Sequence, residues 1–360
     1  MSSQATFYPS EARVIPLALI QCERRLPVQG EVTVRPGMRV EPTDVVAHVH
    51  ETQDFRILDV ARKLHIVRAQ AGQFMRKKVG ETVEAGEVLA ERGGFLFGRE
   101  VRAPVKGVIA AIGNGRVLLE VAPELIELRA HLNGTVASVM PGMGVVIEAA
   151  GAIVQGTWGC GGDAVGVLRV AAEQPHEPLR GKDIDVGCHG AIVVGGAWIE
   201  DSAFEQAQQL QVRGLIAGSM DGELRPKAEA APFPVILTEG LGRSPMAGPI
   251  FELLHAQDGR EASISAETRV RFGVTRPEIL IPLPTESRPS PPPPVGAPLK
   301  VGAQVRIVRP PYMGAVGTVA AIVSRAQRVA SGARLQGAEV DLGGDTGKVF
   351  APYVNLELLR

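Results

Sequence analysis

RPGMRVEPTDVVA at residues 35–47 and KVGETVEAGEVLA at residues 78–90 are two copies of one pattern. Identical residues recur 43 positions apart in the two copies: Gly37 and Gly80, Val40 and Val83, Glu41 and Glu84, Val45 and Val88, and Ala47 and Ala90. Each copy predicts a strand, a turn whose glycine takes a positive φ, and a second strand with alternating apolar positions. Because such a hairpin must bury its apolar face against a partner, the repeat predicts a β-rich fold.

The composition also favours many short strands over long packed helices. Glycine occurs 42 times and proline 27 times, whereas aromatic residues make up only 4%, so turns are abundant and large core side chains are few. A length of 360 residues predicts two or three domains. We therefore expect a multidomain, β-rich protein whose first region spans residues 1–175.

The second copy of the repeat runs directly into FLFGREVRAPVKGVIAAI at residues 95–112. Residues 72–121 resemble a biotinyl- or lipoyl-type domain, the barrel-sandwich hybrid, in which EVRAPVKGVIAAI is similar to the I-x-A-P-x-x-G-x-V continuation of the family. In the biotin carriers of this family the modified lysine stands seven positions before the alanine. Counting back from Ala103 reaches Leu96, so the attachment lysine is absent and we expect no biotin, lipoate or other cofactor.

The resemblance therefore implies a scaffold rather than a carrier. Two interpretations of Phe95-Leu96-Phe97, at the expected hairpin tip, stay open: the three side chains pack in a core, or they form an exposed apolar knob that docks on a partner. Members of the family without the lysine act as structural and docking modules.

Charge and cysteine content limit the class of partner and compartment. A net charge of −1 leaves no global basic field that would attract nucleic acid or an anionic membrane. The three cysteines include no close pair, which favours a reducing compartment, and no apolar stretch approaches the roughly 20 residues of a membrane helix. We expect a soluble, cytoplasmic protein with no membrane partner.

From about residue 183 the pattern changes to alternating strands and helices. Apolar strands are predicted at residues 191–194, 214–218, 234–242 and 261–266, with helical patterns at 202–212 and 246–257. This alternation predicts a small α/β unit over residues 183–281, with a mainly parallel sheet and right-handed crossovers.

In such sheets a ligand crevice lies beyond the carboxyl ends of the strands. The predicted strand ends carry Gly195, Gly196, Gly218, Ser219, Glu239, Gly240 and Gly242. Glycines there either let backbone amides approach an anion such as a phosphate, or serve only the geometry of short turns. We find no catalytic constellation nearby, and Cys160, Cys188 and His189 lack the spacing of a zinc site, so neither catalytic nor metal-binding residues are predicted.

A proline-rich stretch, PLPTESRPSPPPPVGAP at residues 282–298, predicts an extended linker. At ~3.1 Å per residue it would hold the last domain roughly 50 Å away. Beyond it, VGAQVRIVRPPYMGAVGTVAAI at residues 301–322 resembles a KOW motif, with Gly302, Pro311-Tyr312, Gly314 and Gly317 at the matching places. The resemblance implies an SH3-like barrel over residues 299–360 that binds RNA, RNA polymerase or a ribosomal surface.

Local charge and one aromatic residue supply the candidate binding residues. Residues 299–360 contain eight Lys or Arg and four Asp or Glu, a net charge of +4, and Arg325, Arg328 and Arg334 fall in one predicted loop. An arginine loop would contact nucleic acid, whereas Tyr312 would anchor a protein partner.

Taken together, these features predict a non-enzymatic cytoplasmic adaptor or scaffold that recruits a protein partner through a tethered KOW barrel. Two alternatives stay open. One is an RNA-, ribosome- or transcription-associated binding factor acting through residues 299–360. The other is an enzyme with a ligand site at the α/β strand ends.

Overall fold

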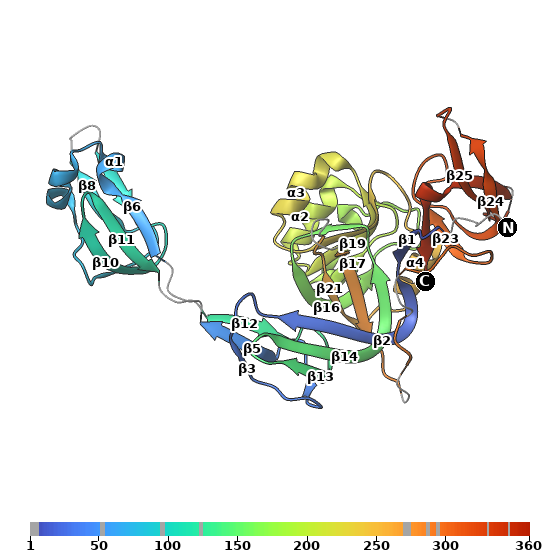
Figure 1. The fold of residues 1–360 in the computed structure, drawn as a ribbon, viewed down its shortest axis with the longest axis horizontal. Helices are drawn as coiled ribbons and strands as arrows, with labels where there is room; N and C mark the ends of the chain where they lie inside the picture. The colour runs from blue at the N-terminus through green and yellow to red at the C-terminus, as the bar shows by residue number, and fades with distance from the viewer. Residues whose placement is uncertain are drawn as a thin grey trace.

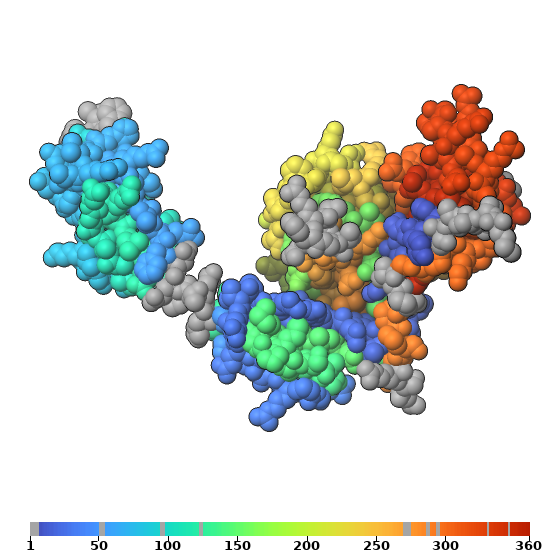
Figure 2. All heavy atoms as spheres, in the orientation of Figure 1, coloured from blue at the N-terminus to red at the C-terminus, as the bar shows by residue number. Residues whose placement is uncertain are grey.

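The computed structural model describes residues 7–50, 55–93, 98–121, 125–268, 275–285, 289–292, 296–329, 331–344 and 346–360 (Figures 1 and 2). Strands account for 47% of the chain and helices for 14%, distributed over several sheets, which confirms the β-rich prediction. In the described part of the chain, no helix is long and apolar enough to cross a membrane.

Residues 55–121, here called the inserted lobe, lie apart from the rest of the chain (Figure 1). One sheet has the order β6 (Phe55–Asp59), β11 (Arg116–Val121), β10 (Gly107–Gly113) and β7 (Thr82–Val83), and β8 (Val88–Arg92) pairs with β9 (Arg99–Arg102). Helix α1 (Val60–Leu64) and the 3-10 helix η1 (Arg68–Phe74) cover one end. The core shared by these elements means that the unit begins at residue 55 rather than at the predicted residue 72.

The two sequence copies adopt the same local structure. Gly37 and Gly80 have φ angles of 85° and 88°, as the repeat predicts. The following turns are closed by equivalent hydrogen bonds, because Asp44 accepts from the backbone N–H of Glu41 (2.8 Å) and Glu87 from that of Glu84 (2.9 Å).

The first copy belongs to a β-unit of its own, into which the second copy is inserted. The elements of this unit are β3 (Glu31–Val32), β4 (Arg39–Val40), β5 (Val45–His50), β12 (Leu125–Arg129) and β13 (Gly134–Met140). The predicted hairpin is not formed, because β4 pairs with β13 and β5 pairs with β3 and β12. Strand β5 pairs with β12 up to residues 50 and 125, so the whole inserted lobe leaves and re-enters the chain at the end of this strand pair. The unit built around the first copy thus carries the inserted lobe at its tip.

The largest sheet of the described chain joins twelve strands and crosses the predicted boundary near residue 175. Its antiparallel half contains β2 (Val14–Arg25), β14 (Gly144–Gln155), β22 (Glu278–Pro282), β21 (Glu261–Ser265) and β16 (Asp163–Val170), in addition to β13 and β4. Strand β16 then pairs in parallel with β17 (Ile192–Val194), which links the β-rich region to the α/β region without a break.

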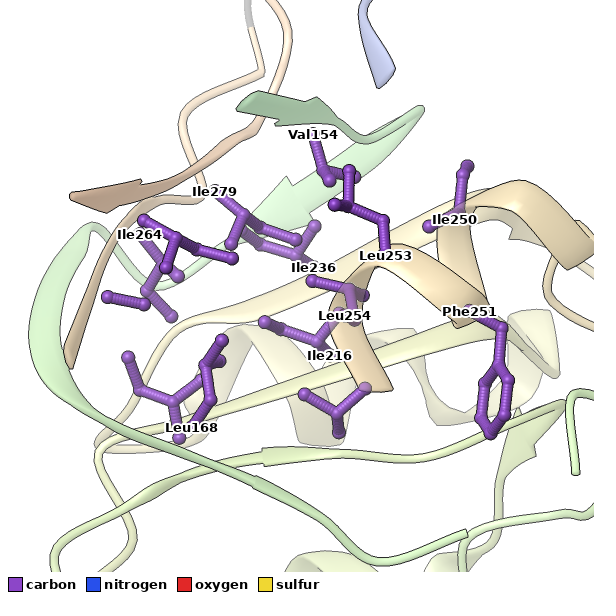
Figure 3. Close-up of a cluster of buried hydrophobic side chains, with 14 of the residues drawn as sticks. Val154, Leu168, Ile216, Ile236, Ile250, Phe251, Leu253, Leu254, Ile264 and Ile279 are labelled. Carbon is purple, nitrogen blue, oxygen red and sulfur yellow. The ribbon is translucent and has the colours of Figure 1, made fainter. Parts of the chain in front are cut away.

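The other half of this sheet contains the strands and helices predicted for the α/β unit. Strands β17, β19 (Gly214–Met220) and β20 (Val235–Leu241) run parallel, β15 (Trp158–Cys160) closes the edge against β20, and β18 (Trp198–Ile199) pairs with β19. The helices are α2 (Asp201–Gln209), α3 (Arg225–Ala230) and α4 (Gly248–His255). Helix α4 packs Ile250, Leu253 and Leu254 on the apolar face of the sheet (Figure 3).

The C-terminal sheet has the order β1 (Ser10–Ala12), β27 (Leu356–Leu359), β23 (Gln304–Ile307), β24 (Val316–Arg328), β25 (Arg334–Asp341) and β26 (Lys348–Pro352). Strand β1 comes from the other end of the sequence and pairs in parallel with β27. Phe7 stacks on Tyr353, with ring centroids 4.6 Å apart. The sheet therefore extends beyond residues 299–360.

The proline-rich segment does not act as the predicted spacer where the structure describes it. The carbonyl of Ser290 accepts a hydrogen bond from the N–H of Leu19 (3.0 Å), and Glu11 accepts from the N–H groups of Gly296 and Ala297. Proline removes backbone donors but leaves the carbonyl acceptors, so such a segment can still bind a neighbouring strand. The prediction of a domain held at a distance is corrected by these contacts.

Gly107 is a position where the repeat architecture requires glycine. A Cβ there would lie 2.2 Å from the carbonyl oxygen of Glu120, whereas a Cβ on Gly113 in the same strand would meet nothing within 4 Å. Gly107→Ala should therefore lower the free energy of unfolding of the inserted lobe by about 1–3 kcal/mol. Native-state hydrogen exchange of β10 and β11 measures this, with Gly113→Ala as control. Equal protection in the two variants would contradict the assigned register.

Candidate functional site

Three of the predicted crevice glycines are used for packing. A Cβ would lie 2.7 Å from the Leu179 side chain at Gly195, 2.2 Å from the Gln174 carbonyl oxygen at Gly196, and 2.6 Å from the Met246 nitrogen at Gly218. Protein atoms therefore occupy the space in which a ligand would approach these three residues. Of the two interpretations of these glycines, the structure favours steric geometry.

The remaining predicted crevice residues differ from one another. The Ser219 hydroxyl donates to the carbonyl of Ser244 and accepts from its N–H, both at 2.8 Å, so it holds a loop rather than facing a ligand. Gly240 and Gly242 have φ angles of 96° and 135°, which favour glycine. Glu239, near the end of β20, is the predicted residue with charged partners.

Arg306 from the C-terminal sheet enters this strand end and is 1% exposed. Its Nη1 atom donates to Glu239 Oε1 (2.8 Å) and to the carbonyl oxygen of Thr238 (3.0 Å). Sequence reasoning missed Arg306 because alternation in β23 places it opposite the buried Val305 and Ile307, on the face expected to meet solvent. The α/β part of the large sheet covers that face, so the C-terminal domain is docked rather than tethered.

Two further charged side chains complete the cluster. Glu357 on β27 accepts from Arg306 Nε (3.0 Å) and from Arg276 Nη2 (2.6 Å), and it also pairs with Arg306 Nη2. The charged cluster of Glu239, Arg276, Arg306 and Glu357 thus joins β20, β23, β27 and the segment that precedes β22.

The two carboxyl groups respond differently to burial. Burial raises the pKa of Glu239 above its usual value, and the Arg306 guanidinium only partly offsets this effect. Burial also opposes the charged form of Glu357, but Arg306 and Arg276 together hold its pKa below the usual value. Of the two acids, Glu239 is therefore the one that more readily holds a proton.

A cavity of about 240 Å³ adjoins this cluster. It is lined by Ser10, Thr157, Glu239, Arg276, Arg306, Val308, Met313, Gly314 and Glu357. The lining comes from both ends of the sequence and from the middle, so no single motif of the sequence indicates it. This interdomain cavity lies at the end of β20, close to the predicted crevice but on the side facing the C-terminal domain.

The three predicted arginines lie on a hairpin rather than in a loop. Strand β24 continues through Arg328, and the hairpin β24–β25, here called the arginine hairpin, projects from the C-terminal domain (Figure 1). Arg328 lies directly opposite Arg334 in the strand register, and Arg325 lies three residues earlier on β24. All three are exposed, and none forms an ion pair with another described residue.

Tyr312 lies at the other end of β24, in the loop that enters it, and is 37% exposed. The same loop contributes Met313 and Gly314 to the interdomain cavity. The structure therefore does not bring Tyr312 together with the arginines.

The other candidate residues show no assembled site. Cys160 and Cys188 pack with the same apolar cluster, and burial raises the pKa of the Cys160 thiol to about 11. Within the described ranges, no three His, Cys, Asp or Glu side chains are placed to share a metal ion. Phe95, Leu96 and Phe97 lie outside the described residues.

Comparison with known proteins adds no assignment. No protein-family model matches the chain, and no curated protein shows significant sequence similarity to it.

Removing Arg306 should destabilise the docking of the C-terminal domain. Arg306→Met leaves Glu239 without a charged partner in a buried position, which costs about 3–5 kcal/mol. Hydrogen exchange in β23 and β27 measures the effect. Arg309→Met, an exposed position three residues on, serves as the control and should change little. Equal exchange rates in the two variants would show that the buried pair does not hold the domain.

The opposite pKa shifts predict opposite pH effects. With a raised folded pKa, Glu239 contributes stability that is fully present below its unfolded pKa, near 4.5, and is lost as the pH rises through the folded value. Glu357 contributes stability that is present above pH 4.5 and is lost as the pH falls through its lowered folded value. At pH 7, Glu239→Gln should therefore be at least as stable as the native chain, and Glu357→Gln less stable. Denaturant unfolding from pH 4 to pH 8 tests the pair, and a reversed order would contradict the assignment.

Proposed function

We propose that this protein is a non-enzymatic adaptor that binds RNA through the arginine hairpin of its C-terminal domain. The observation that carries the proposal is the group of Arg325, Arg328 and Arg334, exposed on one projecting hairpin without an acidic partner among the described residues. The resemblance of residues 301–322 to a KOW motif supports the same class of partner.

Electrostatics within the hairpin favour an external anion. Like charges directly opposite each other on antiparallel strands are destabilising, and Arg328 faces Arg334 in the register. Other surface arginines of the chain have carboxylates nearby, such as Arg225 with Glu229 (2.7 Å). A phosphate backbone supplies the missing negative charges at a spacing that several arginines can contact at once.

The inserted lobe supports the adaptor part of the proposal. Its similarity to lipoyl-type domains comes without the attachment lysine at Leu96, so a scaffold is the remaining use of that fold. Its position at the end of the β5–β12 strand pair places it apart from the arginine hairpin (Figure 1). One chain can therefore present two separate surfaces.

A catalytic function has less support, because Gly195, Gly196 and Gly218 serve packing.

Replacing the three hairpin arginines with alanine should weaken RNA binding and its salt dependence. Because the variant can no longer neutralise up to three phosphates, the slope of log K against log salt should flatten by up to about 2 units, at roughly 0.7 for each phosphate of a single strand. Fluorescence anisotropy with a labelled mixed-sequence single-stranded RNA measures K. The measurements run from about 50 to about 300 mM salt, a range over which such slopes are resolved.

The matched control removes the same charge from the same domain but away from the hairpin. Lys300, Arg309 and Lys348 are exposed, and their triple alanine variant should change the slope by less than about one unit. Tyr312→Ala should bind RNA like the native chain. If the native chain binds no RNA at low salt, or if both triple variants flatten the slope equally, the hairpin is not an RNA site. If the native chain and the arginine variant capture a protein partner and Tyr312→Ala does not, a protein-binding function is favoured instead.

A further inference from the structure

The interdomain cavity contains polar groups that the protein itself leaves unused. Arg276 donates through Nη2 to Glu357, but its Nη1 atom is buried and has no hydrogen-bond partner among the described residues. A buried, unsatisfied guanidinium nitrogen is costly, so a binding partner for it is expected. Arg276 is one of the residues that line the cavity, so a ligand bound there would lie beside this side chain.

Glu239 brings a carboxyl group to the same cavity. Its three hydrogen bonds, from Ala247 N–H, the Thr238 hydroxyl and Arg306, all end on Oε1. Oε2 takes part in none of them, although Glu239 lines the cavity. When protonated, this carboxyl presents an O–H donor, and the Ser10 hydroxyl on the same lining is another.

Size and lining limit the chemical class of ligand. A volume of about 240 Å³ corresponds to roughly eight water molecules at ~30 Å³ each, enough for a ligand of about eight non-hydrogen atoms. Val308 and Met313 contribute apolar side chains beside the charged groups. A short carboxylate with an apolar end matches this lining, because its carboxylate can meet the charged groups and its apolar end can meet Val308 and Met313.

We propose that the interdomain cavity is a binding site for a small carboxylate, held by Arg276 Nη1, by the protonated Glu239 carboxyl and by the Ser10 hydroxyl. The ligand would contact residues of the large sheet and of the C-terminal sheet at once, so its binding would strengthen the docking of the two. The site is separate from the arginine hairpin and does not depend on RNA binding.

Charge balance couples this binding to a proton. The charged groups around Glu239 are Arg306 from β23, Glu357 from β27 and Arg276 from the segment before β22. With Glu239 ionised the four charges cancel, and with Glu239 protonated the cluster carries one positive charge that an anion neutralises. The raised pKa of Glu239, caused chiefly by burial, keeps the protonated form accessible. Affinity for a carboxylate should therefore weaken by up to about tenfold for each pH unit above that folded pKa.

Isothermal titration calorimetry of the full chain with butyrate tests the site. The titrations run from about pH 5.5 to about pH 7.5, where the carboxylate of the probe is ionised. We expect saturable one-site binding that strengthens toward low pH. Arg276→Met should abolish it, and Glu239→Gln should retain it with the pH dependence removed. The exposed Arg309→Met variant should bind butyrate normally.

A second variant separates loss of the ligand site from loss of the fold. Val308→Phe fills the cavity without removing a charge, so it should abolish binding while the unfolding midpoint stays close to that of the native chain. Absence of saturable binding by the native chain, or unchanged binding in Val308→Phe, would overturn the proposal. Binding of inorganic phosphate in place of butyrate would overturn the carboxylate assignment and favour a tetrahedral anion.

Discussion

Arg306 joins the two largest parts of this molecule through a buried charge. Its guanidinium enters the end of β20, is 1% exposed, and contacts carboxyl groups from two different sheets. A lone cation in that position would be prohibitively costly, and Glu357, with its pKa lowered by two arginines, provides the permanent countercharge. The docking of the C-terminal sheet against the large sheet follows from this placement, and a cavity of about 240 Å³ adjoins it.

Local features were readable from the sequence because they depend on neighbouring residues. The repeat predicted turns with positive-φ glycines, and Gly37 and Gly80 adopt such φ angles. The predicted hairpins are not formed, because the two strands of each copy pair with other strands rather than with each other. The alternating pattern after residue 183 located β17, β19 and β20 correctly, because each strand is a short apolar run between turn residues.

Features that depend on distant residues were not readable in this way. Arg306 alternates with Val305 and Ile307 and so has the pattern of a solvent-facing residue, while its partner Glu239 is 67 positions away. Proline density predicted an extended segment at residues 282–298 but gave no information about where its carbonyl groups would bind. The arginine loop was placed in the right region, yet its strand pairing depends on the register between β24 and β25, which composition does not specify.

The pairing of β1 with β27 has a consequence for how the chain is made. Strand β1 leaves the ribosome before its partner β27, which follows about 345 residues later, a delay of roughly 20 to 70 s at ordinary rates of synthesis. During that time the intervening sheet can form, but β1 has no native neighbour and its edge is open to other chains. The short length of β1, three residues, limits this exposure. The C-terminal sheet is thus completed only after β27 has been made, so the order of synthesis limits the order in which these two strands can come together.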